Sequence, residues 1–133
     1  MARSRKTRPV TKADAAAYFA KSTQFMETME QALTAGQWDS VGLQAVHAVI
    51  SASDALVTYR GGVRSAEQDH RVAAHLLQET FGPDAAPAVR HVSHVIAKKN
   101  AVAYEQRRLS EKEAREMAEH ARRFLAWARE RLP

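Results

Sequence analysis

Residues 40–59 carry a single charged side chain, Asp54, and this scarcity of charge constrains the fold more than any other feature. Apolar residues recur through the segment at the three- and four-residue spacing of an α-helix, and glycines at positions 61 and 62 follow it. A helix with so little charge must be buried on nearly every side. The sequence therefore predicts a central helix, from about Asp39 to Arg60, that other helices surround.

Further segments have helical spacing, and capping residues, glycine or proline mark their limits. The clearest start is Ser110, because Glu113 three residues later completes a capping box. The loops between segments are short, so successive helices should pack antiparallel. We predict an all-α, up-and-down bundle of four main helices plus one shorter helix, the segment that starts at Ser65. The predicted helices run from Thr11 to Gly36, from Asp39 to Arg60, from Ser65 to Gly82, from Asp84 through Tyr104 and from Ser110 to about Arg131.

Composition fits a single domain of this kind. The chain has 133 residues, enough for one hydrophobic core, with 45% apolar and 26% charged residues. It has no cysteine, which excludes a disulfide framework and a thiolate zinc site. We find neither a signal peptide nor a membrane-spanning run. We therefore expect residues 11–133 to form one cytoplasmic helical-bundle domain without a membrane partner, and the high alanine and arginine content suggests a bacterial source.

The net charge of +5 belongs to the N-terminus. Five basic residues lie there without an acidic one, and the remaining 15 basic residues balance 15 acidic residues. We predict that residues 1–10 are a disordered basic arm. Such an arm can hold the phosphates of a nucleic acid, or it can be a solvated terminus without a role. Its basic residues are Arg3, Arg5, Lys6 and Arg8, and Lys12 follows.

Asp54 is the first candidate for a functional side chain. A lone carboxylate inside an apolar helix is costly unless it is paired, so it needs a partner. In the functional interpretation Asp54 orients a base or a cation, and in the structural one it forms a buried ion pair that fixes the helix register. The candidate partners along the chain are Arg64, His70, Lys99, Arg107 and Arg108.

A second group of candidates lies near the end of the segment that starts at position 84. Lys99 and Asn100 can face a phosphate, although cations are also favoured at a helix C-terminus. Tyr104 can stack on a base or lie at the edge of the bundle with its hydroxyl in water. We group Asp54 with these three residues as a predicted ligand-binding or structural polar hub.

The histidines do not form a metal-ligand pattern. His91 and His94 are three residues apart, and the four-residue spacing of an HExxH helix is absent. We therefore predict no metal and no cofactor. His47 lies within the apolar helix, where we expect a core histidine with a hydrogen-bonded ring nitrogen.

Three stretches between about Asp39 and Trp127 resemble the HEPN superfamily of small prokaryotic helical bundles. They are AVHAVISASDAL, RSAEQDHRVAAHLL and KKNAVAYEQRRLSEKEAREMAEHARRFLAWA. The resemblance implies a helical bundle that dimerises and is linked to RNA or nucleotides. It also implies a link to toxin–antitoxin pairs, in which a ribonuclease toxin pairs with a nucleotidyltransferase-like antitoxin.

Catalytic members of that superfamily carry an arginine, four to six intervening residues and then a histidine, with a polar residue straight after the arginine. Arg64 and His70 match this spacing, with Ser65 in the polar position, and Arg115 and His120 match the spacing as well. In a ribonuclease of this kind, His70 would act as the general base or acid and Arg64 would hold a phosphate.

The function that we predict from the sequence is that of an interaction module. It would dimerise and bind a protein partner, such as an antitoxin or a nucleotidyltransferase-like protein, or an RNA or nucleotide ligand, without turnover. Two alternatives stay open. One is a metal-independent ribonuclease that uses Arg64 and His70, and the other is nucleic-acid binding through the basic arm.

Overall fold

The computed structural model of the protein describes residues 7–9, 12–61, 63–65 and 72–133. These residues form the predicted all-α bundle, to which one pair of three-residue strands is attached. The elements in chain order are β1 (Thr7–Pro9), α1 (Lys12–Thr34), α2 (Trp38–Gly61), β2 (Val63–Ser65), α3 (Val72–Phe81), the 3₁₀ turn η1 (Gly82–Ala85), α4 (Ala86–Ile96), α5 (Lys99–Ala103) and α6 (Glu111–Arg129).

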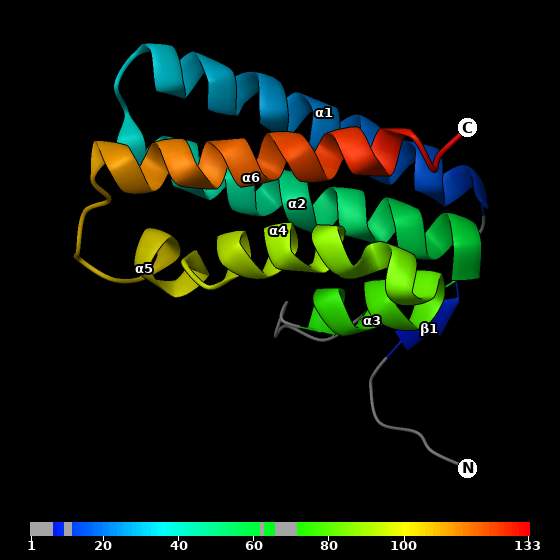
Figure 1. Ribbon diagram of the computed structural model, residues 1–133. Helices are drawn as coiled ribbons and strands as arrows, with labels where there is room; N and C mark the ends of the chain where they lie inside the picture. Colours follow the sequence, from blue (N-terminus) through cyan, green and yellow to red (C-terminus); the bar gives the residue numbers. More distant parts are fainter. Residues whose placement is uncertain (1–6, 10–11, 62, 66–71) are drawn as a thin grey trace.

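The helices α1, α2, α4 and α6 lie side by side and alternate in direction (Figure 1). The short helix α3 and the strand β1 lie at the end where α4 begins, whereas α5 lies at the opposite end, where α2 and α6 begin. The contact between α1 and α2 is the most extensive in the bundle, and α2 also contacts α3, α4, α5 and α6. The helix predicted to be central is therefore confirmed as central.

Burial covers α2 along most of its length. Contrary to our expectation, the helix is long and apolar enough to cross a membrane, but 67% of its most apolar window lies inside the bundle. Such burial is typical of the core helix of a soluble protein. The cytoplasmic location stays a prediction. The buried residues of α2 are Val41, Gly42, Ala45, Val46, Ala48, Val49, Ala52, Ser53, Ala55, Leu56, Val57 and Thr58.

Gly42 allows the segment after α4 to approach α2 closely. A Cβ atom added to this glycine would overlap the Leu109 side chain and would lie 3.0 Å from Val102 Cγ2. It would also lie 3.4 Å from Met117 Sδ. Three parts of the chain meet on this turn of α2: α5, the loop before α6, and α6 itself. Because protein interiors are close-packed, they can do so only if residue 42 has no side chain.

The start of α6 is confirmed in detail. The Ser110 hydroxyl accepts the Glu113 backbone N–H at 3.1 Å, and the Glu113 carboxylate accepts the Ser110 backbone N–H at 3.0 Å. The two bonds complete the capping box and satisfy two backbone donors that the helix itself leaves unpaired.

The prediction of one continuous helix from position 84 through 104 is wrong. The segment is divided into η1, α4 and α5. Where α4 ends, the Lys98 N–H bonds to the Val95 carbonyl at 3.2 Å, a 3₁₀-type contact that ends the regular helix. Neither proline nor glycine marks this position in the sequence. The break turns the chain so that Val102 packs beside Gly42, a tertiary contact that local spacing does not reveal.

Two predictions about the N-terminal segment and the segment after α2 are also wrong. Ser65 is not a helix N-cap, because it lies in β2 and α3 begins only at Val72. β1 and β2 pair antiparallel, with Arg8 opposite Arg64. Arg8 therefore belongs to a strand and not to a disordered arm, because backbone pairing with β2 orders it. Residues 1–6 lie outside the described residues.

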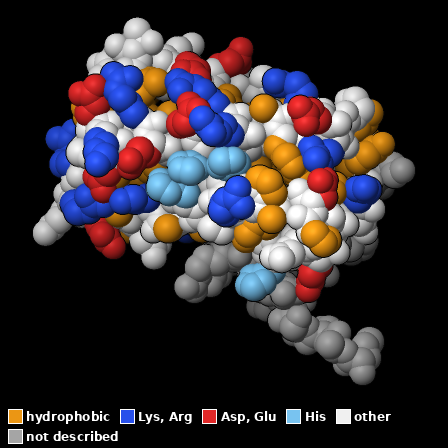
Figure 2. Space-filling view, in the orientation of Figure 1, with side chains coloured by type: hydrophobic (Ala, Val, Ile, Leu, Met, Phe, Trp, Pro, Cys, Tyr) orange, Lys and Arg blue, Asp and Glu red, His pale blue; other side chains and the backbone are white. Residues whose placement is uncertain are grey.

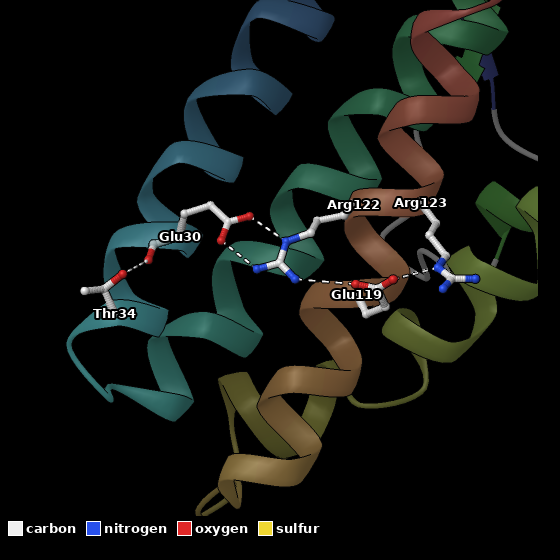
Figure 3. Close-up of polar contacts among 5 residues, drawn as sticks. All are labelled: Glu30, Thr34, Glu119, Arg122 and Arg123. Carbon is white, nitrogen blue, oxygen red and sulfur yellow. Dashed lines mark hydrogen bonds and ion pairs between the residues drawn. The ribbon is translucent and has the colours of Figure 1, made fainter.

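A network of charged side chains joins α1 to α6 (Figure 3). Arg122 donates from Nε and Nη2 to the two carboxylate oxygens of Glu30, each at 2.7 Å. Its Nη1 lies 3.5 Å from Glu119, which accepts from Arg123 Nε at 2.7 Å. The Thr34 hydroxyl donates to the backbone carbonyl of Glu30 at 3.1 Å. A bidentate pair of this kind fixes orientation as well as distance, so it sets how α1 lies on α6.

We predict that Gly42→Ala lowers the free energy of unfolding by about 1–3 kcal/mol, because the added methyl group overpacks the contact with Leu109 and Val102. Urea unfolding followed by circular dichroism measures the change. The matched control is Gly61→Ala in the same helix, where the nearest described atom to an added Cβ is Thr80 Oγ1 at 4.0 Å. Equal stability of the two variants would contradict the close approach at Gly42.

Candidate functional site

Tyr104 is the one large apolar side chain that is exposed in the part of the chain that the structure describes, at 76%. It follows α5 directly, and its N–H bonds to the Asn100 carbonyl at 2.9 Å. The Lys99 ammonium lies 5.3 Å from the centre of the Tyr104 ring, within the range of a cation–π interaction. Three of the predicted site residues therefore form one surface feature, which we call the α5 corner: Lys99, Asn100 and Tyr104.

The loop that follows the α5 corner is held against the start of α2. Asp39 accepts the Leu109 backbone N–H at 2.8 Å and pairs with the Arg108 guanidinium. Leu109 is buried beneath this contact, whereas Arg108 remains 85% exposed. Asp39, which we predicted at the start of its helix, thus has a second role. It fixes the path of the chain between Tyr104 and α6.

Glu113, near the start of α6, binds two cations that flank the α5 corner. Lys98 and Arg107 both bind its carboxylate, at 2.9 and 3.0 Å. The hydrogen bonds from Arg107, from the Ser110 backbone and from Lys98 hold the pKa of Glu113 well below its ordinary range. The carboxylate therefore stays charged at any pH near neutral and keeps Lys98 and Arg107 beside the α5 corner.

Asp54 is not part of the α5 corner. It is half-buried in α2, twelve residues after Gly42, which places it about 18 Å along the helix axis from the turn on which α5 packs. Lys99, Arg107 and Arg108, which were three of its candidate partners, interact with other residues. The structure therefore does not bring the predicted four-residue hub together, because the break after α4 carries α5 to the far end of α2.

Of the predicted catalytic pair and the basic arm, the structure describes Arg64 and Arg8, which lie in the paired strands β2 and β1. Arg64 lies in β2, whose partner strand β1 is drawn at the end away from α5 (Figure 1). His70 lies outside the described residues, as do the arm residues Arg3, Arg5 and Lys6. The ribonuclease hypothesis therefore stays a prediction, and any contribution of Arg64 to binding is separable from that of the α5 corner.

Histidines from α4 and α6 meet at the surface, a feature that the sequence analysis missed. The Nδ1 atoms of His91 and His120 are 2.9 Å apart, a hydrogen-bond distance. The rings of His94 and His120 are stacked, with centroids 3.9 Å apart and 26° between the ring planes. We call these three residues the histidine cluster. A contiguous histidine patch is visible on the face drawn in Figure 2, among basic and acidic side chains.

The surroundings of His91 and His120 disfavour their protonation. Burial lowers the pKa of both His91 and His120. Positive charge lowers the pKa of each ring further, from Arg123 and Arg90 at His91 and from the other histidines at His120. Both rings therefore favour the neutral form, in which one ring nitrogen can accept the hydrogen bond that the other donates.

The reason that the sequence missed the cluster is the distance along the chain. His91 and His120 are 29 residues apart, and only the packing of α4 on α6 brings them together. Spacing along the chain relates His91 to His94 and His120 to Arg115, but it does not relate His91 to His120. Arg115 in fact pairs with Glu111 on the same helix. In the described residues, no group of three histidine, cysteine or acidic side chains could hold a metal ion.

His47 is exposed, so its predicted position in the core is wrong. Its ring lies 5.2 Å from that of Phe25 on α1, with 34° between the planes. The face of α2 that carries His47 turns to the edge of α1, where the ring reaches water beside an aromatic neighbour.

No protein-family model, curated protein or solved structure matches the chain. The HEPN superfamily therefore stays a resemblance carried by the quoted stretches. Within the described residues, the α5 corner presents an exposed aromatic ring with a cation beside it.

We predict that Asp39→Ala lowers the free energy of unfolding by roughly 1 kcal/mol at pH 7, because the Leu109 N–H and Arg108 lose their acceptor. The Leu109 N–H and then Arg108 lower the pKa of Asp39. A lowered pKa means that the stabilisation is present above the unfolded pKa of about 3.9 and is lost as the pH falls through the folded value. The difference between the variant and the wild type should therefore shrink below about pH 4.

Urea unfolding at pH 7 and at pH 3 measures both effects of Asp39→Ala. Asp84→Ala is the matched control, since Asp84 also pairs with an arginine, Arg131, but is 66% exposed and accepts no backbone N–H of the described residues. Its effect at pH 7 should stay below that of Asp39→Ala. A loss of stability that is the same for both variants would show that Asp39 does not anchor the loop.

Proposed function

We propose that the protein is a HEPN-like interaction module that binds single-stranded RNA at the α5 corner without cleaving it. The observation that carries the proposal is the exposed ring of Tyr104, with the Lys99 ammonium 5.3 Å from its centre. Proteins that bind single strands place bases on exposed aromatic rings and place cations along the backbone of the strand.

The cations around Tyr104 support this choice of ligand. Arg107 and Arg108 lie on the loop that follows the ring and are 50% and 85% exposed at their side chains. Each is oriented by a carboxylate, Glu113 or Asp39, which leaves part of the planar guanidinium open to solvent. An arginine held in this way can still donate to a phosphate or stack on a base.

Asn100 adds the polar group that such a site needs. It is exposed and lies in α5, the same short helix as Lys99. Its side chain carries both a donor and an acceptor, so it can pair with the edge of a base. Together the three residues of the α5 corner offer a stacking surface, a charge and a hydrogen-bonding group.

Dimerisation is the second part of the proposal and is supported by the family resemblance. A homodimer would present two α5 corners, and two linked sites bind one strand more tightly than either site alone. Light scattering coupled to size exclusion tests the dimer directly. A mass near 14.8 kDa at micromolar concentration would remove this part of the proposal and leave RNA binding at one corner intact.

We predict that Tyr104→Ala weakens binding to a fluorescently labelled, uridine-rich 12-mer by roughly 5- to 150-fold. This range corresponds to about 1–3 kcal/mol for one stacked base. Fluorescence anisotropy at fixed salt measures the affinity. Tyr104→Phe keeps the ring and should bind as the wild type does, and Lys99→Ala should weaken binding and reduce its salt dependence. Lys112→Ala, an exposed cation on α6, is the matched control and should have little effect.

The competing functions give different results in the same assay. One result is that the oligonucleotide binds equally well to the wild type and to Tyr104→Ala, whereas deletion of residues 1–10 abolishes binding. In that case the basic arm is the binding site and the proposal is wrong. If RNA is cleaved in the presence of chelator and His70→Ala abolishes cleavage, the protein is the ribonuclease of the second hypothesis. If no RNA binds at all, an exposed Tyr104 favours a protein partner.

A further inference from the structure

The histidine cluster joins two helices through a contact that depends on protonation. His91 on α4 and His120 on α6 face each other through their Nδ1 atoms at 2.9 Å. One of these nitrogens must donate a proton and the other must accept it, because both belong to the same kind of ring. The bond therefore exists only while at least one of the two rings is neutral.

A second proton reverses this interaction. When both rings are imidazolium ions, each Nδ1 carries a hydrogen and neither can accept. Two N–H groups and two positive charges then face each other at a distance that suits a hydrogen bond, so the rings have to separate. Because the rings belong to different helices, their separation removes a contact that joins α4 to α6.

His94 makes the cluster still less tolerant of charge. Its ring lies against that of His120, and its Nε2 atom is buried with no hydrogen-bond partner among the described residues. Protonation of His120 would place charge directly on the face of this ring.

The charges around the cluster are mixed but lean to the positive side. Arg90 and His94 on α4 and Arg123 on α6 act against protonation of His91, whereas Glu119 favours it. His120 is opposed by His94, His91 and Arg123 and is favoured by Glu116. The carboxylate of Glu119 is already bonded to Arg122 and Arg123, which reduces what it can offer to an imidazolium ion.

The helix that would be released, α4, packs on α6 beside the histidine cluster. Of all the elements that α4 contacts, α6 is the one with which it makes the most extensive contact. Beneath the cluster the interface between α4 and α6 is apolar. Val92 and Val95 of α4 are buried in the same core as Met117 and Phe124 of α6. Opening this interface would expose apolar side chains of both helices.

We propose that the histidine cluster is a proton-operated latch that holds α4 on α6 at neutral pH and releases α4 in mild acid. The latch does not depend on RNA binding, because the α5 corner does not contribute to it.

The direction of the pH effect follows from the neutral state of the rings. The pKa of both His91 and His120 is lowered in the folded protein, so the unfolded chain binds more protons. The contribution of the latch to stability is therefore complete above the ordinary histidine pKa of about 6.5 and is lost as the pH falls from there through the lowered values.

A metal site is the alternative function for three clustered histidines. The stacked rings of His94 and His120 are nearly parallel, so their nitrogen lone pairs do not point to a common centre. The described residues contain no group of three ligands with suitable geometry. The hydrogen bond between the two Nδ1 atoms uses the lone pair of the accepting nitrogen, which removes one ligand that a metal would need and favours the latch.

Hydrogen–deuterium exchange of the full chain at pH 7.5 and pH 5.5, corrected for the intrinsic exchange rate, tests the latch. Protection of α4 (Ala86–Ile96) should fall by roughly fivefold at the lower pH, the equilibrium factor for one lost hydrogen bond. Protection of α1 (Lys12–Thr34) should stay unchanged. An equal loss in both helices, or no loss in α4, would overturn the proposal.

The variants separate the latch from a general effect of acid. His120→Gln removes the titrating ring, so the protection of α4 should become the same at both pH values. His75→Gln, an exposed histidine on α3, should keep the wild-type difference. If His120→Gln does not fold, His91→Gln serves in its place. Either cluster variant overturns the latch if it keeps the full pH difference.

Zinc chloride provides the test against a metal site. One equivalent at pH 7.5 should leave the Tm of the wild type unchanged. A rise in Tm that EDTA reverses and that His120→Gln abolishes would make the cluster a metal site and would overturn the latch.

Discussion

The burial of α2 is the constraint on which the rest of the structure depends. A helix with a single charge over most of its length is stable only when other helices exclude water from it, so α1, α4 and α6 surround it. The same burial leaves no room for a side chain at Gly42, where Leu109 and Val102 meet the helix. That contact sets the position of α5, and the exposure of Tyr104 follows from it.

The outer helices are oriented by polar contacts that respond differently to acid. Between α1 and α6 the contact is the charged pair of Glu30 and Arg122, and the hydrogen bond from Arg122 lowers the pKa of Glu30. Between α4 and α6 it is the neutral pair of His91 and His120. On our proposal, mild acid therefore opens one side of α6 and leaves the other closed, because a carboxylate keeps its charge at a pH where imidazole gains one.

The two candidate binding surfaces lie at opposite ends of the bundle. Arg8 of the basic arm and Arg64 lie in the β1–β2 pair, and the α5 corner is at the end where α2 and α6 begin (Figure 1). The sequence predicted residues at both ends but also grouped Asp54 with the α5 corner, because the uninterrupted helical spacing through position 104 gave no sign of a break. The turn before α5 depends on a contact with α2, which no local pattern records.

The order of the helices, the central place of α2 and the capping box at Ser110 were determined by the sequence alone, because each follows from local spacing or from a deficit of charge. The tertiary structure alone decided which side chains from different helices meet. Two examples are the contact of His91 with His120 and that of Asp39 with Leu109. The partners are far apart in the chain, and no sequence pattern links them. Helix packing sets such contacts through the shapes of many side chains at once, so spacing along the chain cannot predict them.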